Sequence, residues 1–335
     1  MNLSIRRADA EVEIFLGRGL LKKAGELFDL SRKVLLVTDS GIPRDYVQTI
    51  LSQCKDPMLV TVPAGEENKN FSTYEMLLQA CLAADLTRGD CIVALGGGMV
   101  GDLAGFSAAT YLRGIDFYNI PTSLLAMVDA SIGGKTGLDF GGYKNQVGAF
   151  YQPKAILCDP DLLDTLPERQ LACGYAEVIK MALTLDKDLF YRIESGDAPT
   201  EELIRRAIEC KASVVAKDER DTDLRRVLNF GHTLGHGIES AAKGSLLHGE
   251  CVTLGMIPMC AEPVQKRLVS VLEKYRLPTR YEGAIEPVLS AALHDKKRAG
   301  DTLTVVFVNE PGNYELKKLS FSDWKKEVRR APIFS

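Results

Sequence analysis

The pattern of hydrophobic and polar positions divides the chain into two unlike parts. In the first part, short runs rich in β-branched residues alternate with stretches of helical periodicity. The predicted strands cover residues 11–17, 33–39, 58–63, 91–98, 117–121 and 155–159. Helices are predicted between several of them, at residues 42–54, 72–86 and 100–112. Nearly continuous apolar strands that alternate with helices are typical of a parallel α/β sheet covered on both faces.

After residue 161 the pattern changes to long stretches with a period near 3.6. These stretches predict helices over residues 174–185, 200–217, 224–243 and 249–275. One hairpin is predicted late in the chain, because residues 302–309 and 314–319 flank the turn sequence EPGN. We therefore expect an α/β domain over residues 1–161 and a mostly α-helical domain over 162–335, packed together with an active-site cleft between them.

Composition narrows the class of protein. With 335 residues, 46% of them hydrophobic and 26% charged, the chain has the make-up of a globular protein with a sizeable core. The net charge of −4 argues against a nucleic-acid partner, although lysines gathered in one cleft can still bind a small anion. We expect neither a signal peptide nor a membrane span, since no apolar run approaches the required length. Eight cysteines without a C-x-x-C pair predict reduced thiols and a cytoplasmic location.

A glycine-rich loop follows the predicted strand at 91–98. Gly96, Gly98 and Gly101 satisfy G-x-G-x-x-G, a spacing that lets backbone amides approach a pyrophosphate at a helix N-terminus. Taken alone, the spacing fits a tight turn as well, and the usual fingerprint occurs in the first strand–helix unit of a domain. Asp39, at the end of an apolar strand, is better placed than Asp116 to accept a ribose hydroxyl.

Polar and glycine-rich segments follow other predicted strands of the first domain. The segments PAGEENK at 63–69 and PTSLL at 121–125 lie at strand ends, where open α/β sheets bind their ligands. Lys135 and Lys144 lie in glycine-rich segments that we predict to be loops. Lysines in such surroundings favour binding of an anion over a merely solvated surface.

A polar stripe marks the predicted helix at 224–243. Its members, at spacings of 4, 3, 4 and 3 that place them on one helix face, are Arg225, Asn229, His232, His236 and Glu239. Solvated stripes favour lysine and glutamate, whereas this one is centred on asparagine and histidine. The same helix contains three glycines, each costing roughly 1 kcal/mol relative to alanine. We infer that another group approaches the backbone of this helix closely.

Histidine and carboxylate side chains together favour a zinc site, and a catalytic one needs three protein ligands and an open position. Candidates are His232, His248 at the start of the next predicted helix, and Glu177 in the segment GYAEVIK. Spacing alone would pair His232 with His236, as in metalloprotease helices. However, Thr233 follows His232, so the protease sequence H-E-x-x-H is absent.

Several ordered motifs together resemble the 3-dehydroquinate synthase family of sugar-phosphate cyclases. They are GGGMVGD at 96–102, GF at 105–106, RG at 113–114, PTSLL at 121–125, VDASIGGKT at 128–136, KN at 144–145, GAF at 148–150, AEVIK at 176–180 and NFGHTLGH at 229–236. The match extends from about residue 39 to residue 297. The resemblance implies a nucleotide-binding N-terminal domain, a helical C-terminal domain and a homodimer that requires NAD⁺ and Zn²⁺, with Co²⁺ as an alternative metal.

The activity implied by the resemblance belongs to the shikimate pathway of aromatic amino acid biosynthesis. The substrate, 3-deoxy-D-arabino-heptulosonate 7-phosphate, would be oxidised transiently, lose phosphate, be reduced again and close by an intramolecular aldol step to 3-dehydroquinate. Such an enzyme is a carbon–oxygen lyase that regenerates its NAD⁺ in every turnover.

The resemblance also assigns roles to individual residues. The metal ligands would be Glu177, His232 and His248, while His236 would face the substrate without binding the metal. The cofactor positions are Asp39, Glu66, Lys69, Gly97, Gly98, Asp102, Thr122 and Ser123. The catalytic positions are His236, Lys144, Asn229, Asp129 and Lys135, and the substrate positions are Asn145, Lys180, Lys211, Arg225 and one of Lys296 and Lys297, of which we favour Lys296. Arg113 would reach the phosphate in the neighbouring subunit's site.

Three other functions are weighed against this one. Another sugar-phosphate cyclase would be expected to differ at Arg225, Asn229 or His236, all of which are present here. A metal-dependent polyol or alcohol dehydrogenase would not need so many lysines. A nucleotide-binding regulator without catalysis would not need the three metal ligands.

Overall fold

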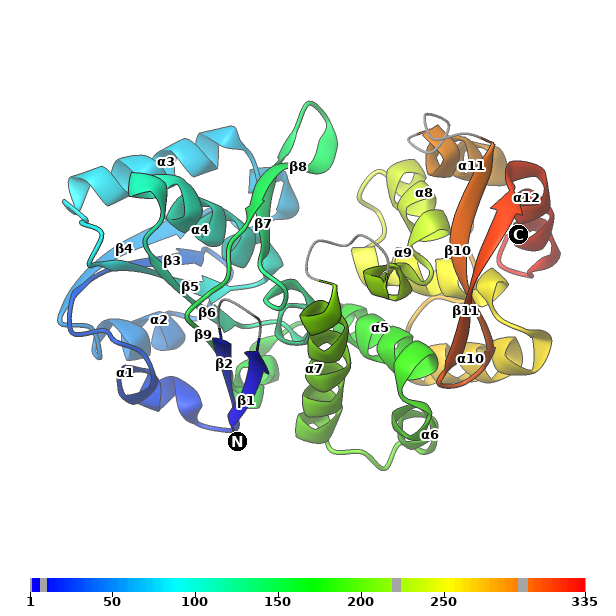
Figure 1. Ribbon diagram of the computed structural model, residues 1–335, viewed down its shortest axis with the longest axis horizontal. Helices are drawn as coiled ribbons and strands as arrows, with labels where there is room; N and C mark the ends of the chain where they lie inside the picture. Colours follow the sequence, from blue (N-terminus) through cyan, green and yellow to red (C-terminus); the bar gives the residue numbers. More distant parts are fainter. Residues whose placement is uncertain (1, 7–10, 219–223, 295–300, 335) are drawn as a thin grey trace. The chain divides into compact units, whose positions relative to one another are not determined.

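The computed structural model describes residues 2–6, 11–218, 224–294 and 301–334, and the chain forms two compact units, Met1–Leu166 and Pro167–Ser335 (Figure 1). The boundary expected after residue 161 falls inside a 3-10 helix, η5 (Pro160–Thr165), at the end of unit 1. In the described part of the chain, no helix has the length and apolar composition needed to cross a membrane.

Unit 1 is built on a seven-stranded sheet with the order β1-β2-β9-β6-β5-β3-β4 over the described residues. Its strands are β1 (Asn2–Arg6), β2 (Glu11–Leu16), β3 (Lys33–Asp39), β4 (Asp56–Val62), β5 (Cys91–Gly96), β6 (Asp116–Pro121) and β9 (Ala155–Cys158). Neighbouring strands are parallel, except that β1 runs antiparallel to β2. Six of these strands confirm the sequence prediction; β1 was not predicted. Every residue of β5 is buried, as expected for a strand covered on both faces.

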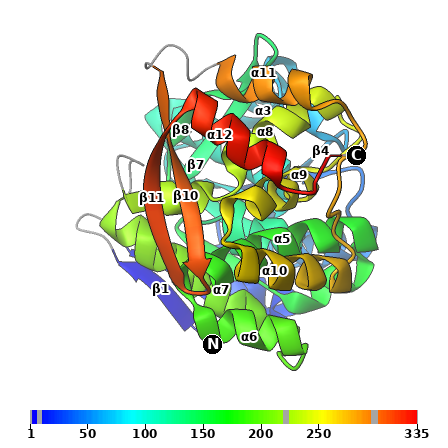
Figure 2. The same ribbon diagram turned by 90° about the vertical axis from the view of Figure 1, so that its right-hand side faces the viewer.

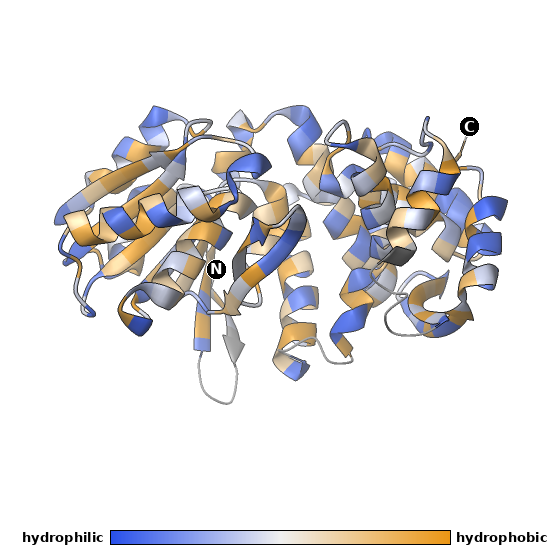
Figure 3. Cartoon of the chain, turned by 90° about the horizontal axis from the view of Figure 1, so that it is seen from above, coloured by the Kyte–Doolittle hydropathy of each residue, from blue (hydrophilic) through white to orange (hydrophobic). Residues whose placement is uncertain are grey.

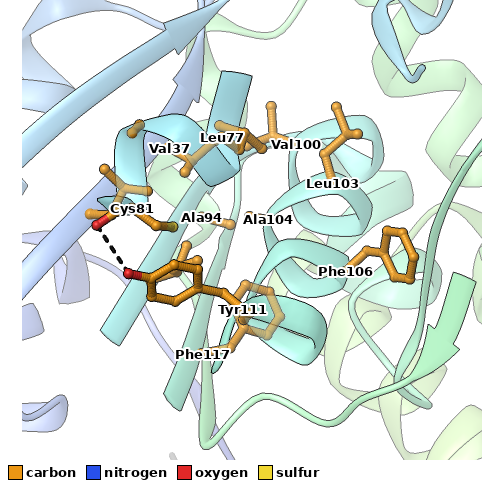
Figure 4. Close-up of a cluster of buried hydrophobic side chains, with 14 of the residues drawn as sticks. Val37, Leu77, Cys81, Ala94, Val100, Leu103, Ala104, Phe106, Tyr111 and Phe117 are labelled. Atoms are coloured by element: carbon orange, nitrogen blue, oxygen red, sulfur yellow. Dashed lines mark hydrogen bonds between the residues drawn. The ribbon is translucent and has the colours of Figure 1, made fainter. Parts of the chain in front are cut away.

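Helices cover both faces of the sheet. They are η1 (Leu20–Lys23), α1 (Ala24–Leu27), α2 (Arg44–Leu51), η2 (Glu66–Asn68), α3 (Phe71–Ala83), α4 (Gly98–Thr110), η3 (Tyr111–Arg113) and the π-helix η4 (Ala126–Ala130). Between α3, α4 and the sheet lies a core that includes Leu77, Val100 and Phe117 (Figure 4). The Tyr111 hydroxyl satisfies its hydrogen bond inside this core by donating to the carbonyl oxygens of Leu86 and Cys81.

The glycine-rich segments that we expected to be loops form a β-hairpin, so that expectation was wrong. Its strands are β7 (Lys135–Phe140) and β8 (Tyr143–Phe150). Gly141 and Gly142 join them with φ angles of 62° and 82°, the left-handed values that a two-residue type I′ turn requires. Gly137 and Gly148 let the strands approach closely, because a Cβ on Gly137 would lie 2.5 Å from the Val147 oxygen. The many glycines had hidden the alternation of a strand.

Unit 2 is mostly helical, as predicted. It contains α5 (Glu168–Leu185), α6 (Lys187–Ser195), α7 (Thr200–Lys217), η6 (Leu224–Asn229), α8 (His232–Ala242), α9 (His248–Met256), η7 (Ile257–Met259), α10 (Glu262–Lys274), α11 (Ile285–His294) and α12 (Phe321–Arg330). The predicted hairpin is confirmed as β10 (Thr302–Glu310) and β11 (Asn313–Ser320), which lies beside α12 (Figure 2). Hydropathy follows the fold, since the strands of unit 1 are mostly hydrophobic and the helices of both units also carry hydrophilic residues (Figure 3).

Two long helices expected in unit 2 are interrupted. The stretch 224–243 is divided between η6, which ends at Asn229, and α8, which begins at His232. Gly231, with a left-handed φ of 78°, is the N-cap of α8. The stretch 249–275 breaks at Cys260, which is extended between η7 and α10. Pro263 lies in the first turn of α10, after the second break, where the missing N–H of proline costs no helical hydrogen bond. The polar stripe therefore belongs to two elements and not to one helix.

Candidate active site

The carboxyl ends of β3 and β5 border the point in unit 1 where the strand order reverses. From β3 the chain proceeds to β4 on one side, and from β5 it proceeds to β6 and β9 on the other. Open α/β sheets bind their ligands in the crevice at such a point. Thr38 ties the two strands together here, because its hydroxyl donates a 2.8 Å hydrogen bond to the Leu95 oxygen.

Asp39 lies at the end of β3, on one side of this crevice. Its Oδ1 accepts a 2.7 Å hydrogen bond from the Gly41 amide. Burial raises the pKa of the Asp39 carboxyl, and the Gly41 hydrogen bond lowers it by less. A half-buried carboxylate with one oxygen held by the backbone has its other oxygen available for a hydroxyl donor such as a ribose.

The glycine loop lies on the other side of the crevice. Gly96 ends β5, and Gly97 is the N-cap of α4 in an extended conformation, with no side chain of the described residues capping the helix. Gly98 could not carry a side chain without displacing Ala130, since its Cβ would lie 3.1 Å from the Ala130 methyl group. Gly101 allows α4 to pack on β6, where a Cβ would meet Asn119 at 3.1 Å. An uncapped N-terminus of a 13-residue helix suits a pyrophosphate.

Thr122 and Ser123 follow β6 and border the same loop. The Thr122 amide donates a 2.9 Å hydrogen bond to the Gly96 oxygen. A Cβ on Gly97 would lie 3.7 Å from the Ser123 hydroxyl, so the two residues are neighbours. Asp129 lies half-buried in η4, a π-helix, which is a form frequent at functional sites.

A buried lysine connects several predicted positions in unit 1. Lys69 is 4% exposed, and its ammonium lies 2.5 Å from Asp102 Oδ2, 2.5 Å from Asn145 Oδ1 and 3.8 Å from Glu66 Oε1. Burial alone would lower the pKa of Lys69, but the Asp102 and Glu66 carboxylates raise it above its ordinary value. Lys69 is therefore a charged group that joins two predicted cofactor residues to one predicted substrate residue.

The remaining predicted residues of unit 1 are exposed basic side chains. Lys135 and Lys144 lie on β7 and β8. Arg113 lies in a turn where Leu112 and Arg113 have φ angles of 49° and 69°. Two successive non-glycine residues in the left-handed region store strain, which is frequent where a side chain must be presented in one direction.

Unit 2 brings the three predicted metal ligands together. One donor atom each from Glu177, His232 and His248 lies within 4.8 Å of the others. Glu177 comes from the middle of α5, and the histidines are the first residues of α8 and α9. Two histidines and a carboxylate are a known ligand set for catalytic zinc.

The surroundings of Glu177 fit a divalent cation. The residue is fully buried, Oε2 is ion-paired with Lys180, and neither oxygen accepts a regular hydrogen bond from a described residue. Oε1 lies 3.9 Å from His248 Nε2, which is too long for a hydrogen bond. Two donors on one tetrahedral zinc ion are about 3.4 Å apart, since each bond is about 2.1 Å long. The separation of Glu177 Oε1 and His248 Nε2 is therefore closer to that of two ligands of one metal ion than to that of a hydrogen-bonded pair.

His232 is held as a neutral ligand. Its Nδ1 lies 3.1 Å from the Phe230 oxygen, a carbonyl that can only accept, so Nδ1 carries the proton and Nε2 keeps its lone pair. Burial lowers the pKa of His232, and Lys180, His248 and His236 lower it further. A neutral imidazole with a fixed tautomer is the form that binds a metal.

His236 is exposed and lies close to both histidines. Its ring centroid is 5.3 Å from that of His232 and 6.0 Å from that of His248. Donor atoms of His236, Glu239 and His248 also lie within 4.8 Å of one another. Distance alone therefore allows two ligand sets that share His248, and the unsatisfied oxygens of Glu177 favour the first set.

Three buried basic residues lie in the same unit. Lys180, Lys211 and Arg225 are at most 5% exposed, which is rare for cations, and Lys180 is paired with Glu177. The Arg225 amide is fixed by Asp218, which accepts a 2.9 Å hydrogen bond from it. Asn229 is exposed and borders a cavity of about 330 Å³, and Lys296 lies outside the described residues.

The glycines of the stripe are explained by helix packing, which confirms the expected close approach to the backbone. A Cβ on Gly231 or Gly235 would lie 2.6 Å or 3.0 Å from carbonyl oxygens of α9. A Cβ on Gly237 would lie 2.5 Å from the Val288 oxygen of α11. From the other side, a Cβ on Gly255 of α9 would lie 1.9 Å from the Gly231 oxygen. Glycine is thus what brings His232 and His248 near each other.

Residues that the sequence did not mark as functional fix the start of α9. The Gly249 amide donates a 3.1 Å hydrogen bond to Cys173 Sγ on α5. The Leu247 amide donates a 2.7 Å bond to Glu250 Oε2, and Arg169 binds both oxygens of Glu250 at 2.7 Å. The sequence marked neither residue, because Leu247 has no side-chain acceptor to complete a capping box with Glu250, and Cys173 belongs to no motif.

Comparison with known proteins identifies the family of the chain. The family profile described as "3-dehydroquinate synthase N-terminal" matches residues 59–173, and "3-dehydroquinate synthase C-terminal" matches residues 174–298. A 3-dehydroquinate synthase of Latilactobacillus sakei is 39% identical over an alignment of 345 residues, gaps included. The alignment covers 98% of this chain and 97% of that relative. Another, of Acetivibrio thermocellus, is 39% identical over 328 residues, with 91% of each chain covered.

The chain belongs to the 3-dehydroquinate synthase family. The sequence-based expectations of family, enzymatic activity and fold class are confirmed. The individual roles of the site residues are not tested by these comparisons, and they stay predictions.

Solved structures of other cyclases share the whole fold with this member of the 3-dehydroquinate synthase family. A 2-deoxy-scyllo-inosose synthase complexed with carbaglucose-6-phosphate, NAD⁺ and Co²⁺ has a TM-score of 0.89 at 25% identity, with 99% of this chain and 100% of that chain covered. The 2-epi-5-epi-valiolone synthase of Streptomyces hygroscopicus, with NAD⁺ and Zn²⁺ bound, has a TM-score of 0.87 at 26% identity, with 96% of each covered. A probable glycerol dehydrogenase of Sinorhizobium meliloti, at 16% identity and a TM-score of 0.65, shares the fold alone.

Proposed function

We propose that the protein converts 3-deoxy-D-arabino-heptulosonate 7-phosphate to 3-dehydroquinate and inorganic phosphate. The observation that carries the proposal is the convergence of Glu177, His232 and His248 in a chain of this family. The substrate is oxidised at one hydroxyl, eliminates phosphate, is reduced again and closes by an intramolecular aldol reaction.

NAD⁺ would be held in unit 1, a proposal supported by its presence in the two related cyclase structures. Asp39 would accept a ribose hydroxyl, and the amides of Gly97 and Gly98 would bind the pyrophosphate. The remaining cofactor positions are Glu66, Lys69, Asp102, Thr122 and Ser123. When bound, the nicotinamide takes up a hydride and returns it in the same turnover.

A divalent metal, Zn²⁺ or Co²⁺, would be held by Glu177, His232 and His248 in unit 2. The related cyclase structures contain one or the other of these ions. When bound, the ion lowers the pKa of a substrate hydroxyl and so prepares it for oxidation. The buried Lys180 forms an ion pair with Glu177 Oε2, which offsets part of the cost of burying that carboxylate.

The basic residues would bind the substrate's two acidic groups. Lys180, Lys211 and Arg225 are buried, so an anion near them is attracted strongly. Arg225 would bind the carboxylate, since a guanidinium matches carboxylate geometry. Lys296 and Asn145 complete the substrate set, and Arg113 would reach the phosphate from a second copy of the chain in a homodimer.

Proton transfers would fall to side chains that the substrate reaches. His236 is exposed beside His232, so it can exchange a proton without serving as a ligand. Asn229, Lys144, Asp129 and Lys135 would orient the hydroxyls and the developing enolate. The eight cysteines are all free thiols, which supports a reducing compartment such as the cytoplasm.

The second candidate is a cyclase for another sugar phosphate, favoured by the likeness to 2-deoxy-scyllo-inosose synthase. Its 25% identity is well below the 39% shared with 3-dehydroquinate synthases, which supports the first candidate.

One assay separates these functions. The metal-loaded protein is incubated with the heptulosonate phosphate and substoichiometric NAD⁺, and phosphate, 3-dehydroquinate and NADH are measured. Release of phosphate together with 3-dehydroquinate and without NADH build-up is expected. Steady accumulation of NADH would indicate a dehydrogenase. No turnover of the heptulosonate, with turnover of a hexose phosphate, would favour the second candidate.

A further inference from the structure

Glu239 is the one member of the polar stripe that the proposed function leaves without a role. It lies on α8, and its side chain is 14% exposed. Its Oε2 lies 3.5 Å from Nδ1 of His248, the first residue of α9. A carboxylate on one helix thus faces the ring of a metal ligand on another.

The two nitrogens of His248 face two different carboxylates. Nε2 lies 3.9 Å from Glu177 Oε1, and Nδ1 lies 3.5 Å from Glu239 Oε2. A neutral imidazole has one N–H and one lone pair, so it can donate to one of these carboxylates and ligate a metal beside the other. The question is which nitrogen carries the proton.

His232 shows the same division with a different acceptor. Its Nδ1 faces the Phe230 carbonyl at 3.1 Å, which leaves Nε2 as the ligand atom. A ligating histidine almost always donates its second N–H to a carboxylate or carbonyl, which fixes the ring and its tautomer. If His248 follows this rule, Glu239 is the acceptor of its Nδ1–H.

The alternative is a metal held by His236, Glu239 and His248, whose donors also lie within 4.8 Å. That set needs the Nδ1 lone pair of His248, and it would direct the ring's only proton toward Glu177. The 3.9 Å gap there is too long for a hydrogen bond, so the fully buried Glu177 would keep an oxygen without a partner. With the metal at Nε2 of His248, Glu177 binds the same metal and Glu239 accepts the Nδ1–H, so each carboxylate has a partner.

The backbone of His248 is already fixed by other residues. Glu250 binds the Leu247 amide before it, and Cys173 binds the Gly249 amide after it. These contacts place the start of α9, but they leave the rotation of the imidazole ring undetermined. Among the described residues, the carboxylates that approach the ring are Glu177 and Glu239.

We propose that Glu239 is a positioning residue, which accepts the Nδ1–H of His248 and thereby holds its Nε2 toward the metal. The proposal rests on the metal ligands assigned under the proposed function. It predicts an effect on metal binding itself and does not depend on turnover.

The first test measures metal affinity. Co²⁺ or Zn²⁺ is titrated into metal-free protein in competition with a chelator, for wild type, Glu239→Gln, Glu177→Ala and Glu262→Gln. Glu262→Gln is the matched control, because it removes one carboxylate from the exposed surface of α10. Glu239→Gln should bind the metal about 10–100-fold more weakly, as is usual when such an outer acceptor is lost, and shift the visible spectrum of bound Co²⁺. Glu262→Gln should match wild type.

The second test observes the ring directly. The chain has four histidines, so ¹⁵N spectra of the imidazoles can be assigned from single His→Ala variants. With zinc bound, His248 should have a protonated Nδ1 and a metal-bound Nε2, and Glu239→Gln should disturb that signal and leave His232 unchanged.

The outcomes are distinguishable. If Glu177→Ala loses the metal and Glu239→Gln binds it as wild type does, the role of Glu239 is wrong and the ligand set stands. If Glu177→Ala binds metal normally, the ligand set itself fails. A second equivalent of metal that disappears in Glu239→Gln would make Glu239 a ligand, and this too would overturn the proposal.

Discussion

Lys69 and Asn145 lie 76 positions apart in the chain, and the Lys69 ammonium donates a 2.5 Å hydrogen bond to the side-chain oxygen of Asn145. The same ammonium is 2.5 Å from Asp102. The loop of Lys69 and the β7–β8 hairpin are also joined through the backbone, because the Asp139 amide donates to the Lys69 oxygen at 2.8 Å. A predicted cofactor residue, Asp102, and a predicted substrate residue, Asn145, are thus held by one buried charge.

Replacing Lys69 by methionine should therefore weaken NAD⁺ binding and loosen the hairpin. A hydrogen bond to a charged group contributes about 1.5–3 kcal/mol, so the Kd for NAD⁺ should rise about 10–100-fold. Calorimetry measures the Kd, and hydrogen exchange over residues 141–145 measures the hairpin. Lys55→Met, an exposed lysine in the same unit, is the control. Unchanged NAD⁺ affinity in Lys69→Met would contradict the assignment.

Asp39 should determine the choice between NAD⁺ and NADP⁺. A carboxylate at this strand end accepts ribose hydroxyls and repels a 2′-phosphate. Asp39→Asn is expected to weaken NAD⁺ binding about tenfold, because one charge-assisted hydrogen bond is lost. It should also reduce the ratio of the affinity for NAD⁺ to the affinity for NADP⁺. Binding titrations with both cofactors check this. If the ratio of the two affinities is the same in variant and wild type, Asp39 does not contact the ribose.

The two histidines of α8 should differ in their effect on bound metal. His232→Ala removes a proposed ligand, so it should lose the metal almost completely after dialysis. His236→Ala should keep the metal and lose turnover, since His236 is proposed to exchange protons with the substrate. Metal content by atomic absorption, with initial rates, tests the division. Equal loss of metal in both variants would show that the division of roles is wrong.

Gly255→Ala should destabilise unit 2 although alanine is the better helix former by about 1 kcal/mol. Its methyl group would lie 1.9 Å from the Gly231 oxygen and 2.8 Å from the Gly235 amide, so α8 and α9 must separate. We expect a loss of about 1–3 kcal/mol in the free energy of unfolding, measured in urea, and weaker metal binding. Ser240→Ala, exposed on α8, should be close to neutral.

The metal ligands themselves were within reach of sequence reasoning. The histidine and carboxylate residue types, combined with the motifs around Glu177 and His232, pointed to the set that the structure brings together. The pairing of His232 with His236 by spacing alone was the weaker inference. Both histidines do lie on α8, but spacing along one helix says nothing of Glu177 and His248, which come from α5 and α9.

The β7–β8 hairpin and the role of Lys69 were harder to predict. Six glycines in residues 133–148 removed the alternation of apolar and polar residues that marks a strand, and the pairing energy comes from backbone hydrogen bonds that leave no trace in side-chain pattern. The resemblance assigned Lys69 to the cofactor, but its contact with Asn145 was not predictable, because the burial of Lys69 depends on residues far away in the chain.

The sequence by itself determined the strands of the parallel sheet, the helical character of the second unit and the residue types that the chemistry needs. Periodicity records which positions are buried, because a buried face must be apolar along its own element. Only the tertiary structure decided which groups meet: Lys69 with Asn145, Gly255 with Gly231, and the two nitrogens of His248 with Glu177 and Glu239. These contacts depend on distances between elements, and a pattern along one chain segment does not encode the distance to another.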